Sequence, residues 1–327
     1  MNSKTNLVCA GIDDGYLWPF LVSIFAAKIH ASSDFRVAVG SINGGLSDES
    51  KKIIEKSADF IEIPIEIRDF SLNEDLQSTH LNIQTYSRLV WLDTLEENFL
   101  WLDADTLPLE NWEGVFNQLA NEPSNIVLSA ALDTTIINNM HKFPSNAAYA
   151  AGGNSYFNAG IFLGNPIAWR DRGYSQKWRE TGSAYRELGF IEHDQDILNY
   201  LLVYDKKIMP PEFNAMVMPS SDIKQKILHF TGNPKPWHFN EVAKRYFISI
   251  ETLKDLKTGL GAFGGTNWVY EYYNYWRHEE MLLTLCQSNL NLASEIGKLF
   301  SGARRELLDN KDLIKLKLLN AAGKKWF

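Results

Sequence analysis

The sequence predicts an α/β fold, in which a mostly parallel sheet carries helices on both faces and a helical C-terminal extension follows. Two observations predict it, the alternation of strand-like and helical segments and the length of the chain. Short apolar runs typical of buried strands alternate with helical segments through the first hundred residues. Strands joined in this way form parallel pairs with right-handed crossovers, as in nucleotide-binding domains. The 327 residues suffice for one large domain with an appendage.

The first half of the chain follows this alternation in order. Strands are expected at 6–12, 35–40, 59–65 and 98–102, and helices at 16–30, 47–57 and 81–95. Asp48 and Glu49 in the first turn of the second helix suit the positive end of its dipole.

After residue 105 the order changes. A helix is expected at 111–120, strands at 126–132, 156–163 and 227–232, and a helix opening at His193. Residues 133–154 are rich in Asn, Ala and Gly without firm periodicity, which predicts a long binding loop or lid.

Asp103 and Asp105 follow the buried strand at 99–102. Open α/β sheets bind ligands beyond the carboxyl ends of their strands, so these acids are expected at the mouth of a cleft. Alternation along an extended chain would point both carboxylates to one side and Ala104 away. Two such oxygen ligands suit Mn²⁺ or Mg²⁺, especially an ion shared with substrate phosphates. The alternative is that both acids are merely solvated.

Four further residues carry two interpretations each. Asp13 and Asp14 end the first strand, where an acid can accept from a base or a ribose, or can cap the next helix. Arg88 could reach a phosphate from its helix, or lie on the surface. Asn158 could bind a sugar hydroxyl, or be a buried amide with its hydrogen bonds satisfied within the protein.

A histidine-containing strand suggests the third metal ligand. His229 precedes Gly232, which lets the backbone approach a phosphate, and Lys235, whose loop is stiffened by flanking prolines. The alternative is a core histidine. Asp194 is a good helix N-cap, but capping does not explain the whole polar run at 193–196.

Composition limits the function. The net charge of −8 argues against general nucleic-acid binding, and two cysteines fit a reducing cytosol. The N-terminal residues do not resemble a signal peptide, and the longest apolar run, Leu17 to Ala27, is too short to span a bilayer. We therefore expect a cytoplasmic protein of undetermined oligomeric state.

The C-terminal stretch is expected to be a separate helical extension. It follows a catalytic domain at 1–245 and occupies 246–327, and its last part, 301–327, is basic and amphipathic. That part suits peripheral contact with an anionic inner membrane surface, or packing on the domain or on a partner.

Six segments together resemble family 8 glycosyltransferases, and the bacterial lipopolysaccharide galactosyl- and glucosyltransferases most of all. The matching segments are 13–16 (DDGY), 86–89 (YSRL), 102–106 (LDADT), 157–160 (FNAG), 194–199 (DQDILN) and 229–237 (HFTGNPKPW). They occur in the order of the family.

The resemblance implies a retaining, metal-dependent enzyme of GT-A fold that transfers a hexose from a UDP-sugar to a glycan or glycolipid hydroxyl in surface polysaccharide synthesis. Asp103, Asp105 and His229 would bind Mn²⁺ or Mg²⁺. The donor would be bound by Gly11 and Asp13 at the uracil, by Arg88, by the Asp103–Asp105 segment including Ala104, and by Gly232 and Lys235 at the diphosphate. Asn158, Asp194 and Gln195 would surround the transferred sugar, with Gln195 facing the anomeric carbon.

One departure and two alternatives remain. Gly15 stands where the family often has an asparagine that contacts the ribose, so ribose binding is less well defined. The run at 102–106 also resembles the start of the haloacid-dehalogenase phosphatase motif, in which Asp103 would be the nucleophile. A non-catalytic sugar-nucleotide binder is the other alternative.

Overall fold

The computed structural model describes residues 5–72, 82–120, 122–123, 125–216, 225–232, 235–238 and 267–287. The chain divides into two compact units, Met1–Ala215 with Ile223–His229, and Met216–Asp222 with Phe230–Phe327. The predicted boundary near residue 245 and the basic stretch at 301–327 lie outside the described residues and stay predictions.

The first unit is built on a sheet of seven described strands. Their order is β3 (Ile65–Phe70), β2 (Phe35–Ile42), β1 (Asn6–Gly11), β4 (Phe99–Leu102), β7 (Phe157–Gly164), β6 (Leu128–Leu132) and β8 (Lys206–Ile208). Among these, β7 alone runs against its two neighbours, and the other pairs are parallel. The predicted mostly parallel sheet is confirmed.

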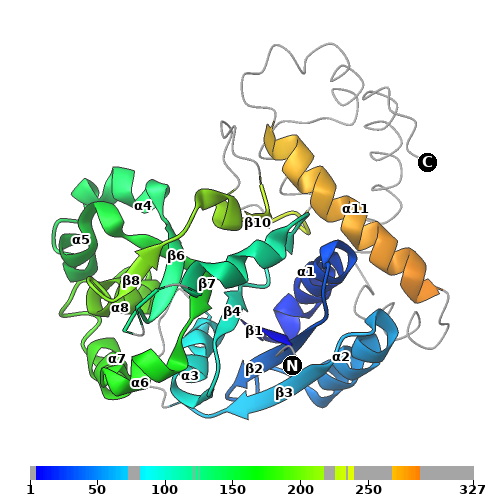
Figure 1. Ribbon diagram of the computed structural model, residues 1–327, viewed down its shortest axis with the longest axis horizontal. Coiled ribbons are helices and arrows are strands. Elements are labelled where there is room, and N and C mark those ends of the chain that lie inside the picture. Colours follow the sequence, from blue (N-terminus) through cyan, green and yellow to red (C-terminus); the bar gives the residue numbers. More distant parts are fainter. Residues whose placement is uncertain are drawn as a thin grey trace. The chain divides into compact units, whose positions relative to one another are not determined.

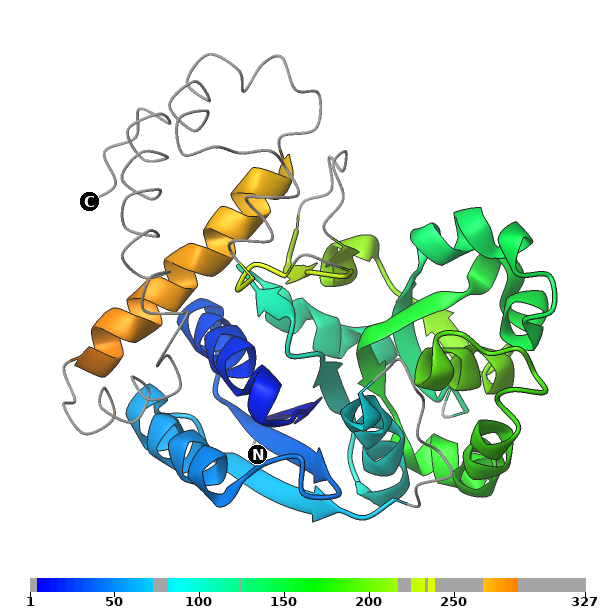
Figure 2. The same ribbon diagram turned by 180° about the vertical axis from the view of Figure 1, so that it is seen from behind.

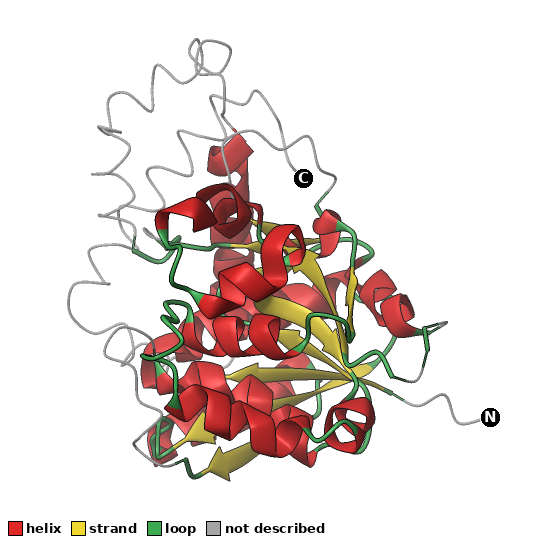
Figure 3. Ribbon diagram, turned by 90° about the vertical axis from the view of Figure 1, so that its left-hand side faces the viewer, coloured by secondary structure: helices red, strands yellow, loops and turns green. Residues whose placement is uncertain are grey.

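Helices cover both faces of this sheet (Figures 1 and 3). Next to strands β1–β3, α1 (Leu17–His30) and α2 (Asp48–Ile61) lie on one side and α3 (Ser87–Thr94) on the other (Figure 1). Further along the chain of this unit lie the helices α6 (Pro166–Asp171), α7 (Tyr174–Ser183) and α8 (His193–Leu201). Helix α1 is buried from Leu17 to Ala27, which explains why that run is apolar on every side.

A second, small sheet brings distant parts of the chain together. Strand β10 (Ile227–His229) lies between β5 (Thr106–Pro108) and β9 (Ala215–Met216). It pairs antiparallel with β5, with His229 opposite Thr106. The 3₁₀ turn η7 (Pro211–Asn214) leads directly into β9.

The predicted strand at 59–65 is wrong. Helix α2 continues to Ile61 because Ile54, Ala58 and Ile61 extend its buried face, and Glu62 in the left-handed conformation (φ 58°) ends it. The strand, β3, starts only at Ile65 and has no fully buried residue, as expected at a sheet edge.

The predicted long loop at 133–154 is also wrong. It contains α4 (Thr134–Asn139), η5 (Met140–Lys142), α5 (Ala147–Gly152) and the start of η6 (Gly153–Ser155). Side-chain oxygens of Asp133 and Asn146 cap α4 and α5, which are too short to show periodicity. Figure 2 shows these helices in teal-green, and α5 packs beside α8.

Several other elements are shorter than expected or of another kind. The helix expected at 111–120 is the 3₁₀ segment η4 (Trp112–Leu119), and the one at 81–95 divides into η3 (Ile83–Tyr86) and α3. The short 3₁₀ turn η1 (Asp14–Tyr16) precedes α1. The strand expected at 227–232 ends at His229.

The second unit contains helix α11 (Asn267–Gln287), which confirms a helical C-terminal extension. Tyr275 packs against Phe230 and Trp237, and the indole of Trp276 donates to the Pro236 carbonyl at 2.9 Å. The helix therefore holds the segment that follows β10. Within the part of the chain that the structure describes, no helix combines the length and hydropathy needed to cross a membrane.

Candidate active site

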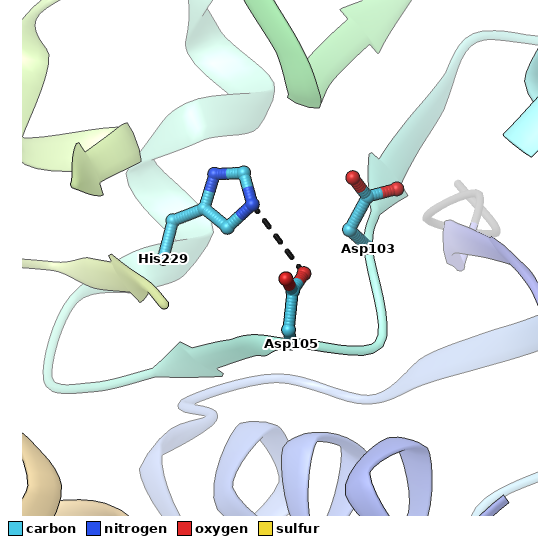
Figure 4. Close-up of side chains that lie close together, drawn as sticks. All are labelled: Asp103, Asp105 and His229. Atoms are coloured by element: carbon cyan, nitrogen blue, oxygen red, sulfur yellow. Dashed lines mark ion pairs between the residues drawn. The ribbon is translucent and has the colours of Figure 1, made fainter. Parts of the chain in front are cut away.

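Asp103, Asp105 and His229 meet at one point (Figure 4). Each offers a ligand atom, and these atoms lie within 4.8 Å of one another. His229 Nε2 lies 3.4 Å from Asp105 Oδ1. Two carboxylates and an imidazole are a donor set that a divalent cation such as Mn²⁺ accepts.

A tight turn gives the two acids their common direction. The backbone amide and the hydroxyl of Thr106 both donate to the Asp103 carbonyl, at 3.1 and 2.7 Å. The sequence suggested that an extended chain would point both carboxylates to one side. In the structure Asp103 and Asp105 converge through a turn instead. Ala104 between them is buried.

The Asp103 carboxylate is held by one of its oxygens. Oδ1 accepts from Arg88 Nη2 and from the Trp101 indole, both at 2.8 Å. Burial raises the pKa of this carboxyl group, the Arg88 guanidinium opposes the rise, and the Asp105 carboxylate adds to it. A cation bound at the cluster would offset the repulsion between the two acids.

Arg88 is a buried cation and not a surface residue, which corrects the alternative interpretation from sequence. Besides Asp103, its guanidinium pairs with Asp194 at 3.1 Å and donates to the carbonyls of Thr85 and Ala159. Its side chain is only 4% exposed. The direct role visible here is to fix Asp103 and Asp194 relative to each other.

Gly160 leaves room for the cluster. A Cβ atom at this position would lie 2.1 Å from His229 Cε1 and 2.8 Å from both His229 Nε2 and Asp103 Oδ2. No such approach is tolerated between real atoms, so a side chain here would displace the donor atoms. The residues around the cluster therefore fit a bound metal ion.

Two of the three predicted sugar-site residues, Gln195 and Asn158, form one hydrogen-bonded group with Asp133. Gln195 Oε1 accepts from the Ala159 amide at 2.9 Å, and its Nε2 lies 3.3 Å from Asp133 Oδ2. Asn158 Nδ2 donates to the same Asp133 oxygen at 3.1 Å. The sequence suggested that Asp194 caps α8. This is wrong, because the Asp194 carboxylate pairs with Arg88 instead.

Asp13 and Gly11 lie at the end of β1. Asp13 Oδ1 accepts from the Tyr16 amide at 3.1 Å, and Asn82 donates to its other oxygen. One oxygen of Asp13 therefore caps the 3₁₀ turn η1, as the capping interpretation from sequence expected. Gly11 is required locally, because a Cβ atom would lie 2.6 Å from both the Gln84 carbonyl oxygen and Ser87 Cβ.

Gly232 and Lys235 belong to the second unit. Gly232 has a positive φ of 73°, which glycine adopts without strain. Lys235 is largely buried, and its Nζ donates to the Phe230 carbonyl at 2.7 Å.

The sequence analysis did not identify four residues that contact or surround the site: Asp133, Tyr16, Trp101 and Asn214. Asp133 ends β6 as Asp103 ends β4, so the strand-end argument could have found it. Tyr16 lies close in sequence to Asp13 and could have been found from it. Burial raises the pKa of the Tyr16 hydroxyl to about 12, and the charges of Asp105, Asp103 and Asp13 add to the rise. Trp101 and Asn214, which contacts His229 Nδ1 at 3.0 Å, follow no pattern that marks them.

Residues 7–241 match the family described as glycosyl transferase family 8. Similar curated proteins include a putative glycosyltransferase of Haemophilus influenzae, 28% identical over 247 residues, covering 69% of this chain and 71% of that protein. The lipopolysaccharide 1,2-glucosyltransferase of Escherichia coli K12 is 24% identical over 272 residues (75% and 77% covered). The lipopolysaccharide 1,3-galactosyltransferase of Salmonella typhimurium is 25% identical over 250 residues (71% and 72%).

Solved structures support the fold. An active-site glutamine-to-glutamate mutant of LgtC has a TM-score of 0.60 at 21% identity, covering 74% of this chain and 94% of that one. The galactosyltransferase LgtC in complex with donor and acceptor sugar analogs has a TM-score of 0.57 at 22% identity, with the same coverage. These likenesses confirm the predicted GT-A fold. Because the family match spans most of the chain, this protein belongs to glycosyl transferase family 8 and is a glycosyltransferase.

Proposed function

We propose that this protein is a metal-dependent, retaining glycosyltransferase that moves a hexose from a UDP-sugar to a glycan or glycolipid hydroxyl in bacterial surface polysaccharide synthesis. The observation that carries the proposal is the convergence of Asp103, Asp105 and His229. The lipopolysaccharide glucosyl- and galactosyltransferases among the relatives support the substrate class. Family membership makes the phosphatase and non-catalytic alternatives wrong.

Asp103, Asp105 and His229 would hold Mn²⁺ or Mg²⁺, and Gly160 leaves room for the His229 and Asp103 side chains that offer the ligand atoms. The ion would supply positive charge against the negative charge that grows on the departing nucleotide diphosphate. Within this proposal Arg88 keeps the Asp103 carboxylate turned toward the cluster, because it holds the other oxygen.

Gln195, Asp194 and Asn158 would surround the transferred sugar. The Gln195 oxygen already accepts a backbone hydrogen bond from Ala159, and an amide oxygen is a weak nucleophile. This favours attack by the acceptor hydroxyl from the side of the leaving group over a covalent intermediate on Gln195. Such front-face attack retains the anomeric configuration.

The remaining donor contacts are proposed from the family resemblance. Asp13 would bind the uracil, above Gly11, and Gly232 and Lys235 would hold the diphosphate. The short helices α4 and α5 would help to shape the acceptor site. Membrane contact through 301–327 belongs to the same proposal.

The test of metal dependence is Asp105→Ala, assayed by UDP release from a panel of UDP-sugars with Mn²⁺. Loss of one charge-stabilising contact of this kind costs about 10²–10³ in rate, and loss of the ion costs more. The control is Asp69→Ala, which removes a surface acid paired with Lys51. Near-normal turnover by Asp105→Ala, or by the unaltered enzyme in excess EDTA, contradicts the proposal.

A thermal-shift screen identifies the donor. A ligand that binds only the folded protein raises its melting temperature by mass action. We expect a UDP-sugar to raise it more with Mn²⁺ than without, and to do so more than the matched GDP-sugar. A larger shift with GDP-sugars contradicts the choice of uridine.

A further inference from the structure

We infer that Asn214 is a positioning residue that fixes the proton of His229 on Nδ1, so that Nε2 presents its lone pair to the metal site. This inference rests on the proposed metal-dependent function. It concerns a residue in the η7 turn that no sequence motif includes. The argument starts from a backbone amide, whose hydrogen-bonding role is fixed.

The first step is the orientation of Asn158. The Gly160 amide can only donate, and it donates to Asn158 Oδ1 at 3.0 Å. At the other end of the same carboxamide, Nδ2 faces Asp133 Oδ2 at 3.1 Å. Two independent neighbours, a donor and a carboxylate, therefore assign the oxygen and nitrogen of Asn158 in the same way.

The second step is the orientation of Asn214. Its carboxamide meets Asn158 Oδ1 at 2.9 Å, and because that atom is an acceptor, the facing atom of Asn214 is the donor Nδ2. The other end of Asn214 is then Oδ1, which can only accept. Asn214 is 2% exposed, so bulk water does not compete for these bonds.

The third step reaches the imidazole. His229 Nδ1 lies 3.0 Å from Asn214 Oδ1, and an acceptor in that position requires a hydrogen on Nδ1. Nε2, which faces Asp105 Oδ1 at 3.4 Å, is then the nitrogen left to bind a cation. Partners of the non-coordinating nitrogen fix both the tautomer and the ring orientation of metal-binding histidines.

The same chain of bonds ends in the proposed sugar site. Asp133 Oδ2 accepts from Asn158 and also lies 3.3 Å from Gln195 Nε2. Three side chains thus connect His229 to Gln195: Asn214, Asn158 and Asp133. Loss of Asn214 would free the imidazole to rotate or to change tautomer without removing a metal ligand.

The direct experiment is ¹⁵N NMR of histidine-labelled protein in EDTA, at a pH where His229 is neutral. The His229 signals are assigned by their loss in His229→Gln. We expect the hydrogen on Nδ1 in the unaltered protein, and a shift of population toward Nε2–H in Asn214→Leu. A hydrogen on Nε2 in the unaltered protein overturns the inference, and this measurement requires no variant of Asn214 to fold.

The second readout is Mn²⁺ affinity, measured by the electron paramagnetic resonance signal of the free ion. Loss of such a supporting partner typically weakens metal binding 10- to 100-fold, and we expect this for Asn214→Leu. The matched control is Asn165→Leu, just after the last residue of β7. It also removes an asparagine whose side chain makes two hydrogen bonds, in this case to backbone atoms of Ile126 and Ala168. Unchanged Mn²⁺ affinity in folded Asn214→Leu, or an equal loss in Asn165→Leu, overturns the inference.

The two proposals fail separately. Unaltered protein that carries the hydrogen on Nδ1 but binds no Mn²⁺ contradicts the proposed metal-dependent function and supports the tautomer assignment. Unaltered protein that binds Mn²⁺ with the hydrogen on Nε2 contradicts the tautomer assignment alone.

Discussion

Replacing Gly160 with alanine tests the proposed metal site without removing any of its ligands. The added Cβ atom would lie 2.1 Å from His229 Cε1 and 2.8 Å from Asp103 Oδ2. Ordinary carbon–carbon contacts are about 3.5 Å or longer, so the imidazole must move by more than 1 Å. Metal–ligand distances tolerate only about 0.2 Å. A displacement of about 1 Å typically costs 10² in rate.

We therefore expect Gly160→Ala to bind Mn²⁺ much more weakly and to lose at least about 10²-fold in UDP release. Overpacking costs about 1–3 kcal/mol of folding free energy, which urea denaturation would measure. The control is Gly164→Ala on the same strand, whose Cβ would meet Phe99, Phe162 and Leu92 at 3.0–3.2 Å. It should lose stability but keep its Mn²⁺ affinity.

The assay has one clear refuting result. If Gly160→Ala binds Mn²⁺ and turns over like the unaltered enzyme, the three side chains do not need the space that Gly160 leaves, and the metal site is misassigned. If Gly164→Ala loses Mn²⁺ equally, the effect belongs to the strand and not to the cluster.

Arg88→Met removes the buried cation that joins Asp103 to Asp194, so we expect a loss of about 3–5 kcal/mol in urea denaturation, as for other broken buried ion pairs; unchanged stability would contradict the structural role of Arg88. Burial lowers the pKa of Lys206 to about 8, and the charged amine lies over Phe157. Lys206→Met should therefore stabilise the fold by about 1–2 kcal/mol at pH 7, a value discounted for partial exposure. Between the pKa of Lys206 in the native protein, about 8, and its value of 10.5 in the unfolded chain, the unfolded chain binds more protons than the native protein. The native protein therefore gains stability as the pH rises through this window. The stability advantage of Lys206→Met shrinks over the same range. An advantage that grows with pH in denaturation curves would refute this reasoning.

The central strands were predictable because each is an apolar run followed by a turn. The same local pattern marked Asp103 and Asp105, since acids directly after a buried strand lie at its functional end. The edge strand β3 was misplaced because it is half exposed, and Ile61 belongs by position to the preceding helix.

Other features depend on tertiary contacts and left no local pattern. Arg88 looks like an ordinary helical arginine, and only the position of Ala159 on β7 and of Asp194 on α8 shows why it is buried. Asp194 has the sequence signature of a helix cap, but the Arg88 guanidinium holds its carboxylate. In both cases a long-range ion pair replaces the local interaction that the sequence suggested.

The small sheet explains how the proposed metal-binding cluster of Asp103, Asp105 and His229 can form from such distant segments. Asp105 directly precedes β5, His229 ends β10, and Asn214 directly precedes β9. Because β10 is the middle strand and pairs antiparallel with β5, its last residue lies beside the first residue of β5. The register of this sheet therefore sets the position of the imidazole against Asp105, while the turn after β4 sets Asp103. A one-residue slip of β10 would turn His229 to the opposite face, so the backbone ladder, and not the side chains alone, defines the donor set.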